Sequence, residues 1–207
     1  MKSDPVDPQT PKYLIEGRGI KADLLLVPRD GRLVVVKDYG KRGWLGRMLG
    51  RFHVAREARI YRILQEVRGV PSFLGSRDRE SFTVAHVPGR PIDQYQHHKQ
   101  EVVEKILEEL ERLIDEIHRK GITHLDLRRR DNILVDENGQ VHIIDFAGSL
   151  HFRPGSLGDW WLFPLLKKID ESAFLKWKQR LAPASMSRKE LSRLRRISLL
   201  RRLWFFN

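Results

Sequence analysis

The chain has 207 residues, of which 41% are apolar, and its 39 lysines and arginines against 27 acidic residues give a formal net charge of +12. This length and apolar fraction suit one domain or two small lobes and argue against a disordered chain. The absence of cysteine excludes disulfides and thiolate chemistry, and no apolar run resembles a signal peptide or a membrane span. The basic charge indicates either an anionic partner or arginines spread over a solvated surface.

The N-terminal part of the chain alternates turn residues with short apolar runs. Residues 1–11 contain three prolines and predict a flexible tail. Strands are predicted from apolar runs at 13–15, 23–27, 33–37 and 81–87. The first two runs are joined by Gly17-Arg18-Gly19, where the glycines either form an ordinary hairpin turn or bring backbone N–H groups close to a phosphate.

A helix is predicted at 54–64, where apolar residues recur at helical spacing. Glu57 lies on this helix, and Lys37 closes the strand at 33–37. We expect the two to form an ion pair, the alternative being that each faces water on its own element. Before the helix, residues 41–53 interleave cations with apolar residues, which predicts either a short helix packed on the same lobe or an amphipathic segment on an anionic membrane.

The centre of the chain contains polar residues that could take part in catalysis or bind a metal ion. A long amphipathic helix is predicted at 100–120, followed by two short strands around a turn at 137–139. Asp126 and Asn132 precede the first of these strands and Asp145 follows the second. A hairpin would bring the three side chains together, which is the arrangement that phosphoryl transfer requires.

Two motifs in this region resemble those of a known superfamily. The segments HLDLRRRDNILV (124–135) and IIDFAG (143–148) are similar to the catalytic loop and metal-binding loop of protein kinases, in the atypical bacterial branch that contains the RIO-like kinases and the lipopolysaccharide core sugar kinases. The resemblance implies an α+β, compact two-lobed protein-kinase-like fold. Its small β-rich N-lobe would be 12–87 and its shortened helical C-lobe 88–184.

The resemblance also implies roles for the residues at the catalytic loop. Asp126 would orient the acceptor hydroxyl and take its proton, and Asp145 would bind Mg²⁺. The second metal ligand is Asn132, if the loop has one extra residue, or Asp131, which occupies the usual spacing. Of the following arginines, Arg128 is expected to neutralise the transferred phosphoryl group.

ATP would be held by residues of the N-terminal half. In this interpretation Lys37, oriented by Glu57, reaches the α- and β-phosphates. Gly17 and Gly19 would cover the phosphates, and the backbone of Ala85 and Val87 would bind adenine. The metal loop has Ala147 where kinases carry glycine, which favours a fixed loop.

The C-terminal part is basic and rich in tryptophan. Asp159 is interpreted as a helix cap, with bracing of the catalytic loop as the alternative, and Trp160 and Trp161 are expected in the core. Residues 185–207 predict a basic amphipathic helix that either packs on the lobe or makes peripheral contact with an anionic membrane.

Together these patterns predict a cytoplasmic, ATP- and Mg²⁺-dependent kinase, which the 185–207 helix could bring to the inner face of the membrane. The expected acceptor is a sugar hydroxyl of an anionic membrane glycolipid such as lipopolysaccharide core. The alternatives are a RIO-like protein serine/threonine kinase and a nucleotide-binding pseudokinase scaffold. Nothing in the sequence resembles a base-reading module, so nucleic acid is not expected as a partner.

Overall fold

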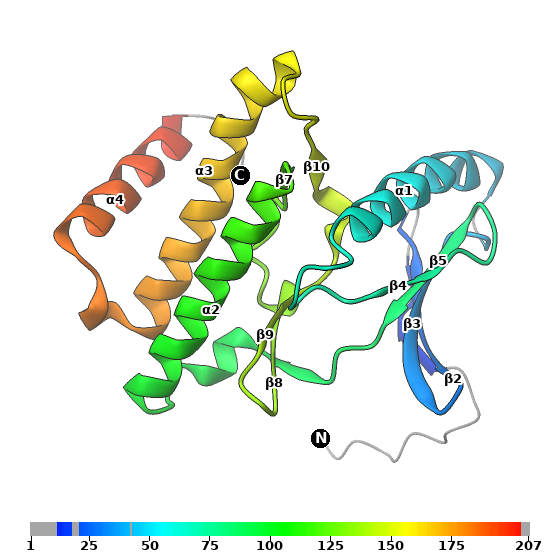
Figure 1. The fold of residues 1–207 in the computed structure, drawn as a ribbon, viewed down its shortest axis with the longest axis horizontal. Coiled ribbons are helices and arrows are strands. Elements are labelled where there is room, and N and C mark those ends of the chain that lie inside the picture. Colours follow the sequence, from blue (N-terminus) through cyan, green and yellow to red (C-terminus); the bar gives the residue numbers. More distant parts are fainter. Residues whose placement is uncertain (1–11, 18–20, 42, 204–207) are drawn as a thin grey trace. The chain divides into compact units, whose positions relative to one another are not determined.

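The computed structural model describes residues 12–17, 21–41 and 43–203, although not the side chains of residue 45 and residues 196–203. It is a mixed α+β structure with four α-helices in the described part of the chain (Figure 1). The chain divides into two compact units. The N-terminal unit comprises Met1–Glu66 and Val70–Val87, and the C-terminal unit comprises Val67–Gly69 and Pro88–Asn207.

The N-terminal unit contains an antiparallel five-stranded sheet of order β1-β2-β3-β5-β4. Its strands are β1 (Lys12–Ile15), β2 (Asp23–Arg29), β3 (Arg32–Asp38), β4 (Phe73–Gly75) and β5 (Ser81–Ala85). The turn between β2 and β3 is Asp30-Gly31, and both residues have positive φ, of 50° and 74°. Such a two-residue turn matches the right-handed twist of the strands and fixes their register.

One long helix, α1 (Trp44–Ile63), packs on this sheet. The sequence predicted a helix at 54–64 and treated 41–53 separately, whereas the helix is continuous from Trp44. Its second half buries a stripe of Val54, Ala58 and Tyr61, and the Tyr61 ring contacts the Phe82 ring of β5 at 5.9 Å. Its first half leaves Trp44, Met48 and Phe52 exposed.

The C-terminal unit is mostly helical. Its helices are α2 (Gln100–Arg119), α3 (Leu157–Leu181) and α4 (Arg188–Leu203). Its three-stranded sheet contains β6 (Gly89–Pro91), β8 (Ile133–Asp136) and β9 (Val141–Ile143), and a small pair joins β7 (Ile122–Thr123) to β10 (Leu150–His151). The predicted helix and hairpin are therefore present, with α2 ending one residue before the predicted limit.

The apolar stripe of α2 forms the core of this unit. Leu110 and Leu113 are fully buried, and α2 contacts α3, β7 and β9. Gly121 follows the helix with φ 72°, the left-handed conformation expected of a glycine at a helix end.

Two features of α3 differ from prediction. Its cap is Ser156, whose Oγ accepts from the Asp159 backbone N–H, while Asp159 Oδ2 accepts from Gly155 N at 3.0 Å. Asp159 is thus the third residue of the helix, where its backbone N–H donates to the capping Ser156 and its carboxylate accepts from the residue before the cap. Trp160 and Trp161 are 75% and 79% exposed instead of buried in the core. A search of the described residues finds no helix long and apolar enough to cross a membrane.

We expect Gly69→Ala to destabilise the fold more than Gly139→Ala. Both glycines have positive φ, so alanine strains either backbone by about 1 kcal/mol. At position 69 a Cβ would also lie 2.6 Å from the Val141 carbonyl oxygen, whereas at 139 it would meet nothing within 4 Å. Overpacking adds about 1–3 kcal/mol, and chemical denaturation should resolve this difference. Equal losses for the two variants would contradict the prediction.

Candidate functional site

The N-terminal unit contains the predicted ion pair between Lys37 and Glu57. Lys37 Nζ donates to Glu57 Oε1 at 2.6 Å, and both side chains are buried. Glu57 lies on the face of α1 that also presents Val54 and Tyr61, so the helix turns its carboxylate toward the sheet. In the register Lys37 stands opposite Phe82, whose ring contacts Tyr61, and this places the ammonium on the same side of the sheet. A buried pair of this kind holds the ammonium in one position.

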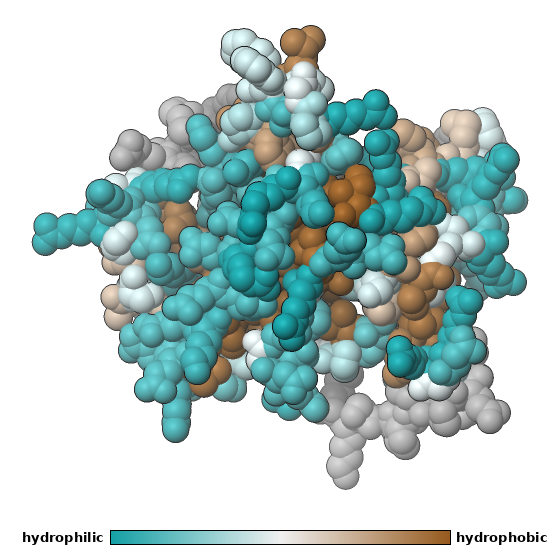
Figure 2. Space-filling view, in the orientation of Figure 1, coloured by the Kyte–Doolittle hydropathy of each residue, from teal (hydrophilic) through white to brown (hydrophobic). Residues whose placement is uncertain are grey.

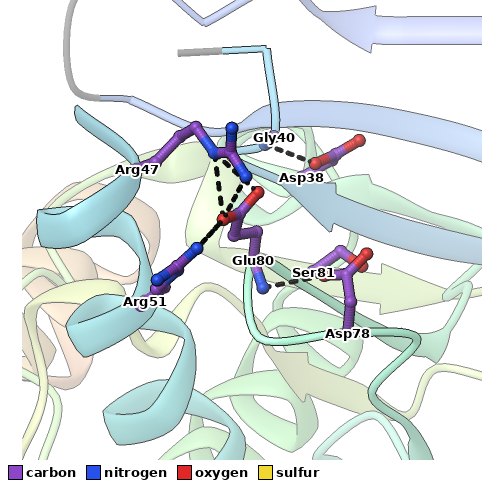
Figure 3. A network of polar contacts seen from close by, with 7 residues as sticks. All are labelled: Asp38, Gly40, Arg47, Arg51, Asp78, Glu80 and Ser81. Carbon is purple, nitrogen blue, oxygen red and sulfur yellow. Dashed lines mark hydrogen bonds and ion pairs between the residues drawn. The ribbon is translucent and has the colours of Figure 1, made fainter. Parts of the chain in front are cut away.

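A second set of charges anchors the other half of α1 (Figure 3). Glu80, just before β5, accepts hydrogen bonds from Arg47 at 3.0 Å and from Arg51 at 2.7 Å. These two hydrogen bonds lower the pKa of Glu80. Asp78 supports the turn by accepting from Glu80 N at 2.7 Å and Ser81 Oγ at 3.0 Å. The helix that carries Glu57 is therefore tied to the sheet at both of its halves.

The glycine predicted to cover the phosphates has a contact within its own hairpin. Gly17 N donates to Asp23 Oδ1 at 2.9 Å. A Cβ at Gly17 would lie 2.3 Å from the carbonyl oxygens of Lys21 and Ala22, which explains the glycine. Gly19 lies outside the described residues.

The predicted adenine-binding segment lies at the end of the N-terminal unit. Ala85 N donates to Ser72 O at 2.9 Å and is therefore occupied within the unit. Val87 is the last residue of the unit, and Pro88 begins the next segment of the C-terminal unit.

In the C-terminal unit the hairpin of β8 and β9 connects the candidate catalytic residues. Asn132 Nδ2 donates to the backbone oxygen of Asp126 at 3.0 Å and to its Oδ2 at 3.2 Å. At the other end of the hairpin, Ile144 N donates to Asn132 O at 3.0 Å, directly before Asp145. The predicted hairpin thus links Asp126 to Asn132, and the backbone of Asn132 to the residue before Asp145.

Asp145 has an unusual backbone conformation that its neighbours maintain. Its φ is 64°, in the left-handed region that non-glycine residues adopt at a cost. The next residue, Phe146, is fully buried and contacts the His124 ring at 4.9 Å. His124 Nε2 lies 3.1 Å from the Ile144 oxygen, and Asp126 N donates to His124 Nδ1 at 3.3 Å. The imidazole therefore lies between the segments that carry Asp126 and Asp145.

The loop that carries Asp126 is held by Asp170 on α3, a residue that the motifs in the sequence did not indicate. Asp170 is 1% exposed, and its Oδ1 accepts from Leu125 N at 2.8 Å while Oδ2 accepts from His124 N at 2.8 Å. Oδ2 also lies 3.0 Å from His118 Nε2. Leu125 has a φ of 69°, a strained value for a bulky residue, and these hydrogen bonds hold it there.

Other residues of α3 also contact this loop. Trp177 Nε1 donates to Leu127 O at 2.7 Å, and Arg128 Nη2 donates to Ser172 Oγ at 3.1 Å. A sequence signal for Asp170 existed, because it shares one helical stripe with Ala173 and Trp177. A carboxylate within an apolar stripe requires a buried partner.

The arginines after Asp126 are arranged differently from the prediction. The Arg128 guanidinium donates to Ser172, so in the structure this side chain packs against α3. Arg129 is the one beside the carboxylate, with Nε 3.9 Å from Asp126 Oδ2. Arg130 pairs with Asp93 at 3.2 Å and with Asp131 at 3.5 Å.

Asp131 and Asn132 have different environments. Asp131 has a 60% exposed side chain paired with Arg130, whereas Asn132 is buried against Asp126. Because the Asn132 amide donates through its nitrogen, its oxygen remains the atom able to coordinate a cation. Together with the Asp145 carboxylate it would supply the hard oxygen ligands that Mg²⁺ prefers. Among the described residues there is no group of three or more His, Cys, Asp or Glu able to hold a metal by themselves.

Comparison with known proteins gives a partial relation. A stretch of 57 residues, 28% of this chain, is 39% identical to sperm motility kinase Z of Mus musculus, and it covers 11% of that protein. No family model matches the chain. The similarity therefore connects one segment of the chain to part of a protein named as a kinase.

We expect Asp170→Asn to lower the free energy of unfolding by about 3 kcal/mol. The buried carboxylate accepts three hydrogen bonds, and the substitution would replace one of its oxygens by an NH₂ group that faces N–H donors. Asp159→Asn is the matched control on the same helix, where the carboxylate accepts one exposed backbone bond and should cost less than about 1 kcal/mol. Urea denaturation measures both. Similar losses for the two would show that Asp170 does not hold the loop.

Stability should also fall as the pH drops below about 6.5, the ordinary pKa of histidine. Burial lowers the pKa of His124, and its Nδ1 accepts from Asp126 N, so the folded state requires a neutral ring. The unfolded state then binds more protons below pH 6.5, and the free energy of unfolding falls. In His124→Gln this fall should be smaller, as measured by denaturation across that pH range. An unchanged slope in the variant would contradict this assignment.

Proposed function

We propose that the protein is an ATP- and Mg²⁺-dependent phosphotransferase with a two-lobed protein-kinase-like fold, related to the RIO-like and lipopolysaccharide core kinases. The observation that carries the proposal is the hairpin that joins Asp126 to Asn132 and leads directly into Asp145. The buried Lys37–Glu57 pair supports it independently, because a glutamate that holds a buried lysine in place suits a fixed phosphate-binding charge.

Each unit would contribute one part of the chemistry. Lys37, oriented by Glu57, would bind the nucleotide phosphates, and Asp145 with the Asn132 oxygen would hold Mg²⁺. When bound, the ion would neutralise the phosphate charge. Asp126 would orient the acceptor hydroxyl and accept its proton, a task that depends more on position than on a shifted pKa. Arg129, which lies beside Asp126, would neutralise the transferred phosphoryl group, the role that the sequence suggested for Arg128.

For the acceptor we propose a sugar hydroxyl of an anionic membrane glycolipid, with a protein serine or threonine as the second candidate. The net charge of +12 favours an anionic substrate. Peripheral membrane contact through 185–207, at the inner face of the membrane, remains part of this proposal. Arg188 and Lys189 at the start of α4 are exposed, as such contact requires.

A pseudokinase scaffold is the second function with specific support. Gly17 N–H is used by Asp23, and the metal loop carries Ala147, so both phosphate-binding loops depart from the usual pattern. Against it, Asn132 is buried next to Asp126 despite the shifted spacing, where its oxygen would serve as a metal ligand.

The test is Mg²⁺-dependent ATP binding and turnover by purified wild-type protein and variants. Asp126→Ala should retain binding and lose turnover by about 10²–10⁴-fold, the usual contribution of a positioned base. Asp145→Ala should lose Mg²⁺-dependent binding, because it removes a ligand of the ion that bridges the phosphates.

Asn132→Ala and Asp131→Ala form a matched pair for the second metal ligand. We expect the first to impair turnover and the second to resemble wild type, since Asp131 is exposed and paired with Arg130. The reverse result would transfer the metal role to Asp131. Binding of ATP by wild type without any turnover in the presence of glycolipid or protein acceptors would favour the scaffold, and no binding would reject the kinase proposal.

A further inference from the structure

The first half of α3 exposes an apolar surface on the C-terminal unit. Leu157, Trp161, Leu165 and Ile169 recur every four residues and therefore share one side of the helix. We call this surface the α3 ridge. It consists of the exposed residues Leu157, Trp160, Trp161, Leu162, Leu165 and Ile169. At the top of the view in Figure 2, where Figure 1 draws the beginning of α3, a small brown group stands beside pale residues of intermediate hydropathy.

The ridge is not used by the packing of α3. The second half of the helix buries Phe174, Leu175 and Trp177 in the core. In the first half the inward residue is Phe163, whose ring contacts Phe152 at 5.4 Å and His118 at 6.2 Å. The helix is thus apolar on both its inner and outer sides. Soluble surfaces rarely carry a continuous apolar patch of this kind unless something binds there.

Contacts of α4 lie on the other half of α3. Lys178 donates to Glu190 at 2.7 Å, and Arg193 pairs with Glu171. The earlier residue of α4 pairs with the later residue of α3, so the two helices are antiparallel. Their contact begins near the C-terminal end of α3. Neither of these two pairs involves a ridge residue.

Two lysines lie beside the C-terminal end of the ridge. Lys168 is exposed between Leu165 and Ile169, and Lys167 lies one residue earlier, with Nζ 5.8 Å from the Phe163 ring. From Arg153 to the end of the chain there are thirteen lysines and arginines and four acidic residues. Most of the net charge of +12 is therefore carried by the segment that contains the ridge.

We propose that the α3 ridge is a docking surface for an anionic lipid bilayer. Tryptophan is the side chain best suited to the boundary between headgroups and acyl chains, because its ring is apolar and its N–H can still be hydrated. Leucines beside the tryptophans would enter the acyl region, and the flanking lysines would bind anionic headgroups. This combination of a basic segment and exposed tryptophans is the pattern of an interfacial helix.

The charges favour a bilayer over a second copy of the chain. A symmetric dimer through the ridge would place the same surface of two molecules face to face. Lys167, Lys168 and the basic segment around them would then oppose their own copies, which like charges disfavour. An anionic membrane satisfies both the apolar residues and the cations.

The inference goes beyond phosphotransfer and beyond the membrane contact expected of 185–207. It is tested without nucleotide, so a failure of the kinase proposal does not affect it. The experiment is co-sedimentation of the 207-residue chain with phosphatidylcholine vesicles, with and without phosphatidylglycerol. Binding is expected only when phosphatidylglycerol is present, and it should weaken with added salt.

Two variants separate the apolar and electrostatic contributions. Trp160→Ser/Trp161→Ser should weaken binding by at least about tenfold, because it removes the largest apolar area of the ridge. Lys167→Gln/Lys168→Gln should weaken it by about tenfold on anionic vesicles only. Since all four side chains lie on the helix surface or its edge, circular dichroism melting should be close to that of wild type.

Trp44→Ser is the matched control. Trp44 is 77% exposed, like the two ridge tryptophans, but it lies in the N-terminal unit at the start of α1, where Arg47 and Arg51 are engaged by Glu80. This variant should bind as wild type does. Three results would overturn the proposal: no binding by wild type, an equal loss in Trp44→Ser, or a dimer in sedimentation velocity that Trp160→Ser/Trp161→Ser abolishes.

Discussion

The C-terminal unit depends on one buried carboxylate. Asp170 accepts hydrogen bonds from two consecutive backbone N–H groups, of His124 and Leu125, and thereby holds a leucine at positive φ. Without this acceptor the loop would relax toward ordinary dihedrals, and Asp126, the next residue, would turn with it. Because Asp170 belongs to a packed helix, the position of the candidate catalytic residue is determined by the core and not by the loop itself.

The same principle applies to the other candidate residues. Glu57 reaches Lys37 because α1 is packed on the sheet by Tyr61 and tied to it by Glu80. Asn132 reaches Asp126 because the β8–β9 hairpin begins directly after it. In each case regular elements supply the rigidity and a short irregular segment supplies the functional group, which is how proteins keep polar side chains in fixed positions.

Charge and apolar surface are distributed unevenly along the chain. The candidate chemistry lies before Gly148, whereas most of the net positive charge and the α3 ridge follow it. The helix α3 contributes both to the candidate site and to the ridge. Its second half holds the loop that carries Asp126 through Asp170, Ser172 and Trp177, and its first half carries the apolar ridge. A partner bound at the ridge would therefore contact the same helix that positions Asp126.

The sequence by itself determined the elements whose signals are local. The helical spacing of apolar residues in α2, the turn between β8 and β9 and the strand that carries Lys37 all follow from short-range pattern. The structure contains each of them, although this strand extends to Asp38. Tertiary structure alone decided that Asp170 supports the loop, that Arg128 faces α3 while Arg129 pairs with Asp126, and that Trp160 and Trp161 are exposed. The physical reason is that an apolar or charged residue on a helix indicates a face, but only long-range packing determines what that face meets.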